Sequence, residues 1–453
     1  MTEHAEGQPT PAPKFDPELA HHARPKLRPV RGFPARHGEQ VLLGIADARQ
    51  ISDRMVFTAP GAQLILPHLN GTNDIDAILA AVGRGLQRSD LEVLVAQLDN
   101  AGLLEGPVFE ALLAKVRSDF DSAPNLPPAT TVNAAEALVV QELGEKATAE
   151  QKAELGPAKL RAAMDGWMKQ ALEPVSDPSF DALPRAIIAP HLDYWRGWMN
   201  YAHTYGRLRV TDRPDRIVIL GTNHFGHSTG VCACDKGFQS PLGACELDRT
   251  FLDALKSHLN AEQSRMLLEN RYDHEREHSI ELHIPWIQHV FGADEQGRYA
   301  RVVGVLVHDP TPKNGESYDG KGLSIFPFID AMQAALAQLP GRTLIVSSAD
   351  LSHVGASFGD KVQFTGESPE SVQFRNKVIQ HDREMLELIA QGKAEELVAS
   401  MAWQQNPTRW CSIGNLVATL KICRDPKVKM LNYVMAGDQQ GVAMVSSCAA
   451  AVF

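Results

Sequence analysis

Two short apolar runs, each ending in a histidine, place the strongest constraint on how this chain can fold. Residues 185–191 read Arg-Ala-Ile-Ile-Ala-Pro-His, and residues 216–224 read Arg-Ile-Val-Ile-Leu-Gly-Thr-Asn-His. Both runs are β-branched and bounded by Pro or Gly, which is typical of buried parallel strands. The intervening residues 194–210 are compatible with a helix and are long enough for the crossover that parallel strands require.

The order of these elements predicts that the two histidines meet. In an open α/β sheet, ligands bind just beyond the carboxyl ends of the strands. His191 and His224 each follow a predicted strand, so we expect both imidazoles at one edge of one sheet. Two imidazoles at such an edge predict a metal site that is assembled from distant parts of the sequence.

The remainder of this region supports an α/β fold. Further strands are predicted at 301–307, 343–347 and 441–446, and helices at 248–259, 328–339, 374–391, 394–404 and 412–423. The alternation predicts a three-layer α/β domain, in which a mixed or parallel sheet carries helices on both faces.

Changes in composition divide the 453 residues into four segments. We expect a disordered tail at 1–22, a small winged-helix domain at 23–107, a helical linker at 108–182 and the α/β domain at 183–453. The tail is polar and rich in proline, and the linker is rich in Ala, Glu and Lys.

The small domain is predicted to place strands before helices, as a winged-helix domain does. The strands are predicted at 40–45 and 55–58, and the helices at 62–69, 75–83 and 90–101. A DNA-binding winged helix is one interpretation. The acidic residues Asp90, Glu92 and Asp99 in the last helix count against it, because a recognition helix normally carries Arg or Lys.

Composition and charge limit the partners that this chain can have. The formal net charge of −11 argues against non-specific binding to nucleic acid, because phosphates would be repelled. No apolar run is long enough to cross a membrane, and the N-terminus lacks the pattern of a signal peptide. We therefore expect a cytoplasmic protein without a membrane partner, whose six cysteines are thiols or metal ligands rather than disulfides.

Five segments bring candidate ligands or acid–base groups to the ends of predicted strands and helices. They span residues 189–194, 221–227, 273–283, 347–353 and 408–414. A single histidine at a strand end is usually structural, but several such segments in one domain favour a functional site.

The third segment contains several histidines of different expected roles. His278 and Glu281 are three residues apart and would share a helix face, so we interpret His278 as a site residue that Glu281 orients. His283 would lie about 140° around a regular helix from His278, so the two cannot both chelate, and His283 is equally well explained as structural. We expect His274 to be solvated.

The last two segments supply an Asp–His pair and a cysteine. Asp350 and His353 could form an oriented base, or Asp350 could cap a helix, and the spacing leaves both open. Cys411 directly precedes a predicted helix. A helix N-terminus lowers the pKa of a thiol, which makes Cys411 plausible as a thiolate ligand or nucleophile.

Together the five segments resemble the Memo family, also called AmmeMemoRadiSam system protein B. The five segments occur in the same order as in the family, and the resemblance covers residues 183–453. It is carried by Arg185–His191 with Tyr194, by Ile219–His224, Glu277–Pro285 and Val346–His353, and by Cys411. The run Glu-His-Ser-Ile-Glu-Leu-His-Ile-Pro is its most specific part.

The resemblance implies a fold shared with class III extradiol dioxygenases and a metal site. Fe(II) is the expected metal, with Zn or Cu as alternatives, and the implied ligands are His191, His224 and Cys411. The implied acid–base residues are Asp350 and His353, with His278 and Glu281 close by. A thiolate is softer than the carboxylate of the dioxygenases, so the resemblance does not by itself imply dioxygenase activity.

The chain departs from the family pattern around the ligands. Leu192-Asp193 stands where the family has Ala-Gly, the paired histidines of the second motif are spaced as His224-Phe-Gly-His227, and Ser-Ile-Gly follows Cys411 in place of Arg-His-Pro. These departures affect the substrate pocket more than the metal site.

The small N-terminal domain resembles PqqD-like domains, which recognise leader peptides. Arg24–Lys26, His68–Ile75 and Leu98–Leu104 carry this resemblance. It implies a module in which an extended peptide adds a strand to the edge of a sheet.

Two main hypotheses for function follow. The first is a non-haem iron-dependent oxidoreductase acting on a peptide or small molecule beside a radical-SAM partner, with His353 as the base and Asp350 orienting it. The second is a non-catalytic metal-binding adaptor, which a closed coordination sphere would favour. A zinc hydrolase on the same ligands is a third and weaker interpretation.

Overall fold

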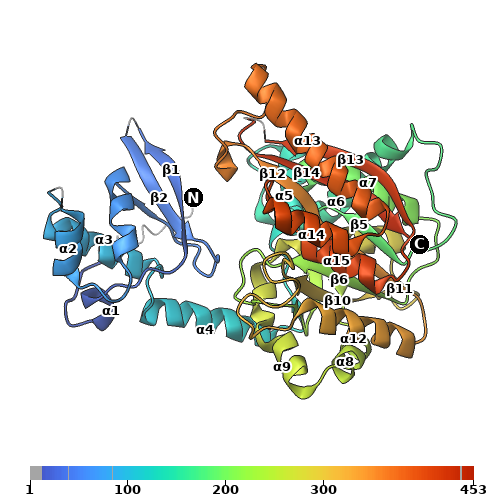
Figure 1. Cartoon of the computed structure of the whole chain (residues 1–453), viewed down its shortest axis with the longest axis horizontal. Coiled ribbons are helices and arrows are strands. Elements are labelled where there is room, and N and C mark those ends of the chain that lie inside the picture. The colour runs from blue at the N-terminus through green and yellow to red at the C-terminus, as the bar shows by residue number, and fades with distance from the viewer. Residues whose placement is uncertain (1–12, 39, 84, 439–440) are drawn as a thin grey trace. The chain divides into compact units, whose positions relative to one another are not determined.

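The structure, a computed structural model, describes residues 13–38, 40–83, 85–438 and 441–453 (Figure 1). The chain is divided into two compact units, and the division in the sequence falls between Ser122 and Ala123. The predicted tail at 1–22 lies partly outside the described residues. Its last residues are structured, because α1 (Ala20–Ala23) is helical and His22 is buried against Asp99. No helix in the described ranges is both long and apolar enough to span a membrane.

The first unit contains one antiparallel sheet and several helices. Its elements are β1 (Val30–His37), β2 (Gln40–Asp47), β3 (Val56–Thr58), the 3-10 helices η1 (Pro60–Leu64) and η2 (Leu66–His68), and α2 (Ile75–Val82), α3 (Arg88–Asn100) and α4 (Pro107–Ser122). The sheet order is β1-β2-β3, so β3 is an edge strand. The helix predicted at 62–69 is wrong in type, because Pro60 and Pro67 begin two separate 3-10 turns.

The second unit is built on an eight-stranded mixed sheet in the order β12-β14-β5-β11-β6-β10-β7, with β13 paired to β14. The four central strands are parallel: β5 (Ala186–Ala189), β11 (Thr343–Ser348), β6 (Arg216–Thr222) and β10 (Arg301–Val307). The antiparallel strands are β12 (Asp350–Val354), β14 (Met444–Val452), β13 (Val428–Gly437) and β7 (Cys232–Ala233). A small separate sheet joins β4 (Asn125–Leu126), β8 (Gly237–Ser240) and β9 (Gly243–Cys245).

Helices cover both faces of the large sheet, as predicted for an α/β fold. One face packs against α8 (Arg249–Ser257), α12 (Ile325–Gln338), α13 (Pro369–Ala390), α14 (Ala394–Gln404) and α15 (Ile413–Ile422). The other face packs against α7 (Tyr194–Leu208) and α10 (His278–Glu281), with α6 (Ala149–Leu172) and α11 (Ile284–Phe291) against α7. Strands covered on both faces are apolar through their centres, which explains the continuous runs in the sequence.

The segment predicted as a linker is divided between the two units. Helix α4 belongs to the first unit, whereas α5 (Thr130–Leu143) and α6 belong to the second. Leu160, Met164 and Met168 are fully buried and recur every four residues, so α6 carries an apolar stripe that packs on α7. Residues 123–182 are therefore part of the α/β unit.

Candidate metal centre

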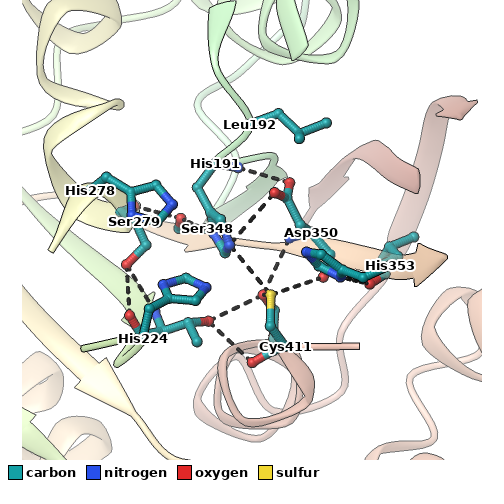
Figure 2. Close-up of polar contacts among 12 residues, drawn as sticks. His191, Leu192, His224, His278, Ser279, Ser348, Asp350, His353 and Cys411 are labelled. Atoms are coloured by element: carbon teal, nitrogen blue, oxygen red, sulfur yellow. Dashed lines mark hydrogen bonds and ion pairs between the residues drawn. The ribbon is translucent and has the colours of Figure 1, made fainter. Parts of the chain in front are cut away.

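The three predicted ligands are brought together at the carboxyl edge of the parallel strands. His191 follows β5, His224 follows β6, and Cys411 directly precedes Ser412, the residue before α15. One ligand atom from each of the three lies within 4.8 Å of the other two. Figure 2 shows the three side chains converging, with His278 beyond His224 and Asp350 beside His191.

The His191 imidazole is held in one tautomer by a serine. The Ser348 hydroxyl donates to the carbonyl of Ser279 (2.5 Å), so it can only accept a hydrogen bond from His191 Nδ1 (3.0 Å). His191 Nε2 therefore keeps its lone pair, and it lies 3.4 Å from Cys411 Sγ. Burial, and then the neighbouring His224, lower the pKa of His191 well below its usual value, which favours this neutral form.

The His224 imidazole is held by Glu277. Its Nδ1 donates to Glu277 Oε1 (3.0 Å), and its backbone N–H donates to Oε2 of the same carboxylate (2.8 Å). Burial alone would lower the pKa of His224, but the charge of Glu277 and the contact with Cys411 outweigh it and raise that pKa well above the usual value. A protonated His224 carries a proton on Nε2 as well as on Nδ1. A metal that binds at Nε2 would displace the Nε2 proton, as metal binding at imidazole and thiol ligands generally does.

Glu277, rather than Glu281, is the carboxylate beside His278. Glu277 Oε1 lies 3.3 Å from His278 Nδ1, and the His278 ring stacks on His224 at 4.8 Å. Glu281 instead accepts hydrogen bonds from the backbone N–H groups of Ala129, Thr130 and Thr131 at the start of α5. The predicted pairing of His278 with Glu281 assumed a longer helix, whereas α10 is only four residues long and Glu277 is its N-cap.

Ser279 and Asn415, which the sequence did not single out, fix the strand ends. Ser279 Oγ accepts from the backbone N–H of Thr222 and donates to its carbonyl, both at 3.0 Å. Asn415 Nδ2 donates to Thr222 Oγ1 (3.0 Å) and to the carbonyl of Ser348 (2.7 Å). The ends of β6 and β11, which lead into the site, are thus tied to α10 and α15.

Asp350 contacts His191 and does not orient His353. Its Oδ1 accepts from the backbone N–H of His191 (3.0 Å), and its Oδ2 lies 3.6 Å from His191 Nε2. Asp350 begins β12, so the alternative of a helix cap is wrong. Burial raises the pKa of Asp350 to about 7, although the hydrogen bond from His191 works in the opposite direction.

His353 is oriented by its own strand. Its Nδ1 donates to the carbonyl of Leu351 (2.8 Å), which leaves Nε2 unprotonated in the neutral ring. Burial lowers the pKa of His353 to about 4, so the ring is neutral at neutral pH. His353 can accept a proton, but the predicted Asp350–His353 pair is not formed.

The other histidines and cysteines of these segments have structural positions. His283 is fully buried and bonds Tyr205 through Nδ1 (2.9 Å), which supports the structural alternative. His274 is also buried, with Nε2 at 3.2 Å from the carbonyl of Cys232, so the expectation that it is solvated is wrong. The five cysteines other than Cys411 are buried, and all six are free thiols.

The donor set fits a transition metal. Two imidazoles whose Nδ1 atoms are already hydrogen-bonded present Nε2 toward one thiol, and borderline or soft divalent metals accept such a set. Three protein donors leave coordination positions for other ligands.

The fold and this site define an α/β protein with a candidate metal centre at the carboxyl edge of a mixed sheet. Residues 146–452 match the family model described as Memo-like protein, and this match covers more than half of the chain. The chain therefore belongs to the Memo-like family. The matched residues all lie in the second unit.

Proteins described as MEMO1 family proteins are similar to this chain over long stretches. The one from Desulfurococcus amylolyticus is 24% identical over 292 residues, which cover 63% of this chain and 89% of the relative. The one from Methanopyrus kandleri is 26% identical over 307 residues, which cover 66% and 94%. The one from Thermus thermophilus is 29% identical over 249 residues, which cover 54% and 65%.

Proposed function

We propose that the second unit is a non-haem, metal-dependent oxidoreductase that holds Fe(II) with His191, His224 and Cys411. The observation that carries this proposal is that the Nδ1 atom of each histidine is already engaged in a hydrogen bond. Ser348 and Glu277 each occupy an Nδ1, so both Nε2 atoms lie ready beside one thiol. Such hydrogen bonds behind the ligands are typical of functional metal sites. The likeness in fold to class III extradiol dioxygenases is part of the same proposal.

The residues around the ligands suit proton transfer to or from a bound molecule. Fe(II) would supply redox chemistry at an open coordination position. His353 is a neutral imidazole with a free Nε2, so it is the proposed base. The His278 side chain is 28% exposed and stacks on His224, which places it to contact a substrate at the mouth of the site. Asp350 would position His191 by accepting a hydrogen bond from the backbone N–H of His191.

The substrate is proposed to be a peptide or a small molecule, and the first unit supplies the argument for a peptide. A groove of about 550 Å³ is bordered by β3, η1 and α3. Phe57, Leu64 and Val93 line it and are about half exposed. Because β3 is an edge strand, an extended peptide could pair with it and place its apolar side chains in this groove. A PqqD-like winged-helix domain would bind a peptide in this way, by adding it as a strand to the edge of the sheet.

The peptide proposal can be tested without a known substrate. A library of displayed random peptides would be selected on the full-length protein, and Val93→Asp would serve as the matched variant with a blocked groove. Peptides that bind the wild type and not the variant would support the proposal. Enrichment that is equal on both proteins would contradict it.

Two further proposals are a radical-SAM protein partner, which the name AmmeMemoRadiSam of the resembled family suggests, and a cytoplasmic location, which the free cysteines favour. A radical-SAM protein would act on the same peptide or small molecule. A reducing compartment suits the site, because Cys411 must remain a thiolate to bind a metal and the chain's cysteines are all free thiols.

Metal content after anaerobic purification is the test of the metal proposal, with O2 uptake measured on the same sample. We expect near-stoichiometric iron that reacts with O2. Cys411→Ala should lower iron affinity by at least about 100-fold, because the only anionic donor of the set is lost. Cys423→Ala, which alters a buried thiol in the apolar core, is the matched control and should retain iron.

The same measurement separates the alternatives. Unchanged iron affinity in Cys411→Ala would contradict the ligand assignment. Tightly bound zinc without O2 uptake would favour a zinc hydrolase. A stable protein that binds no metal would favour an adaptor.

A further inference from the structure

A buried carboxylate outside the metal centre is connected to the cysteine side of that centre. Asp382 lies in the middle of α13 and is fully buried. Its Oδ1 accepts hydrogen bonds from Ser352 Oγ (2.5 Å) and Trp410 Nε1 (2.9 Å). Its Oδ2 accepts from Tyr433 OH (2.6 Å) and Ser446 Oγ (2.5 Å).

These four donors come from four different parts of the second unit. Ser352 is in β12, Tyr433 in β13 and Ser446 in β14, whereas Trp410 is in the loop between α14 and α15. Burying a carboxylate without hydrogen-bond partners costs much free energy. The four donors therefore hold Asp382 in place, and Asp382 in turn restrains the four residues that donate to it. Asp382 thus fixes the loop relative to the sheet.

The loop that Asp382 holds is the one that carries Cys411. Gln405, Asn406 and Arg409 have φ angles of 58°, 46° and 60°, a left-handed conformation that costs free energy in residues other than glycine. Such a backbone persists only where its surroundings determine it. Asn406 supplies part of this restraint, because its side chain accepts from Trp410 N and donates to Trp410 O, both at 2.8 Å.

The loop is also joined to the strand that carries His353. The backbone N–H of His353 donates to Thr408 O (2.7 Å), and Arg409 Nε donates to His353 O (2.9 Å). Ser352, the neighbour of His353, and Trp410, the neighbour of Cys411, therefore share one acceptor, Asp382 Oδ1. His353 and Cys411 are thus each the sequence neighbour of a residue that donates a hydrogen bond to Asp382.

We propose that Asp382 is a positioning residue for the metal centre, which sets the place of Cys411 through Trp410 and that of His353 through Ser352. This inference rests on the proposed metal-binding function. It predicts that metal affinity depends on a side chain that touches none of the ligands.

The test uses two aromatic residues that bond the same carboxylate. Trp410→Phe removes the donor that leads to Cys411, whereas Tyr433→Phe removes a donor that leads only to β13. Both substitutions keep an aromatic ring and delete one hydrogen bond to Asp382, although Trp410 is buried and its Nε1 also lies 3.1 Å from Ser352 Oγ, whereas Tyr433 is half-buried. Asp382→Asn would be added, but the paired Phe variants decide the question because each removes a single donor and leaves the carboxylate in place.

Co²⁺ is the probe, added to the full-length protein without oxygen. Thiolate coordination gives a charge-transfer absorption that reports the bond to Cys411, and competition with a chelator gives the affinity. We expect Trp410→Phe to lower Co²⁺ affinity about 10-fold and to alter the absorption, in the range seen for residues behind metal ligands. Tyr433→Phe should leave both unchanged, and urea unfolding of the two variants checks that each remains folded under the assay conditions.

The outcomes are distinct for the inference and for the proposed function. Equal Co²⁺ affinity in wild type and Trp410→Phe, or an equal loss of affinity in both Phe variants, would overturn the positioning role while leaving the metal site in place. A wild-type protein that shows no thiolate absorption with Co²⁺ would overturn both.

Discussion

The histidine side and the cysteine side of the candidate metal centre are built in different ways. His191 and His224 follow strands of the sheet, and side chains that contact their rings directly hold them. Cys411 follows a loop with left-handed residues, and its restraints act on the neighbouring Trp410. The sheet already fixes the backbone at His191 and His224, so hydrogen bonds need only fix the orientation of each ring. A loop must be held along its backbone as well.

The largest effect on the histidine side is expected from Glu277→Gln. An amide cannot accept from all the donors that surround this carboxylate, and His224 would lose its fixed tautomer. We expect a fall in metal affinity of about 10- to 100-fold, measured by chelator competition. Glu281→Gln is the control, because Glu281 bonds α5 and not a ligand. Glu281→Gln should lower the stability of the protein and leave its metal affinity unchanged. A loss of metal affinity without a loss of stability would instead support the role predicted from the sequence, in which Glu281 orients His278.

A smaller effect is expected from Ser348→Ala, which removes the acceptor of His191 Nδ1. The ring could then turn, and we expect metal affinity to fall about 10-fold in the same assay. Ser347→Ala is a matched control at the adjacent position, because Ser347 Oγ is buried and has no hydrogen-bond partner among the residues that the structure describes. Equal affinity in the two variants would show that the sheet alone orients His191.

The smallest effect concerns His283, a buried histidine that is not a ligand. Burial lowers its pKa to about 3, whereas the unfolded chain has a value of about 6.5. Between these values the unfolded state binds more protons, so stability is lost as the pH falls below about 6.5. From pH 7 to pH 6 this residue should account for about 0.7 kcal/mol of lost stability.

Urea unfolding of the wild type and His283→Gln at the two pH values measures this effect. The difference in unfolding free energy between pH 7 and pH 6 should be smaller in the variant. The same difference in both proteins would show that His283 is not held neutral by burial.

The sequence was sufficient for the elements that are buried on both faces. The apolar runs of β5, β6 and β10 and the histidines after the first two were predicted, because the centre of such a strand is continuously apolar and a polar side chain follows its end. Strand β13 was not predicted, because it lies at an edge, is half-buried and mixes polar with apolar residues. The strand expected at 441–446 overlaps only the start of β14.

The roles of the carboxylates could not be obtained from spacing. Glu281 was paired with His278 on the assumption of a regular helix, but α10 is a single turn and the N-cap Glu277 faces the histidines instead. The signal for Glu277 was its place directly before a short helical run, where the helix dipole favours a negative charge. Asp382 gave no signal, because an Asp in a helix of mixed composition is usually solvated and its four partners are distant in sequence.

The hydrogen bonds of Glu281 also bear on where this protein can be divided. The family match begins at residue 146, beyond α5, yet the Thr131 N–H and hydroxyl and the N–H groups of Ala129 and Thr130 are the partners of Glu281. A fragment begun at the family boundary would lack α5 and with it all of these donors, so we expect it to be less stable than a fragment that includes α5. A stable fragment of the α/β unit is therefore expected to start ahead of α5, earlier than the family match does.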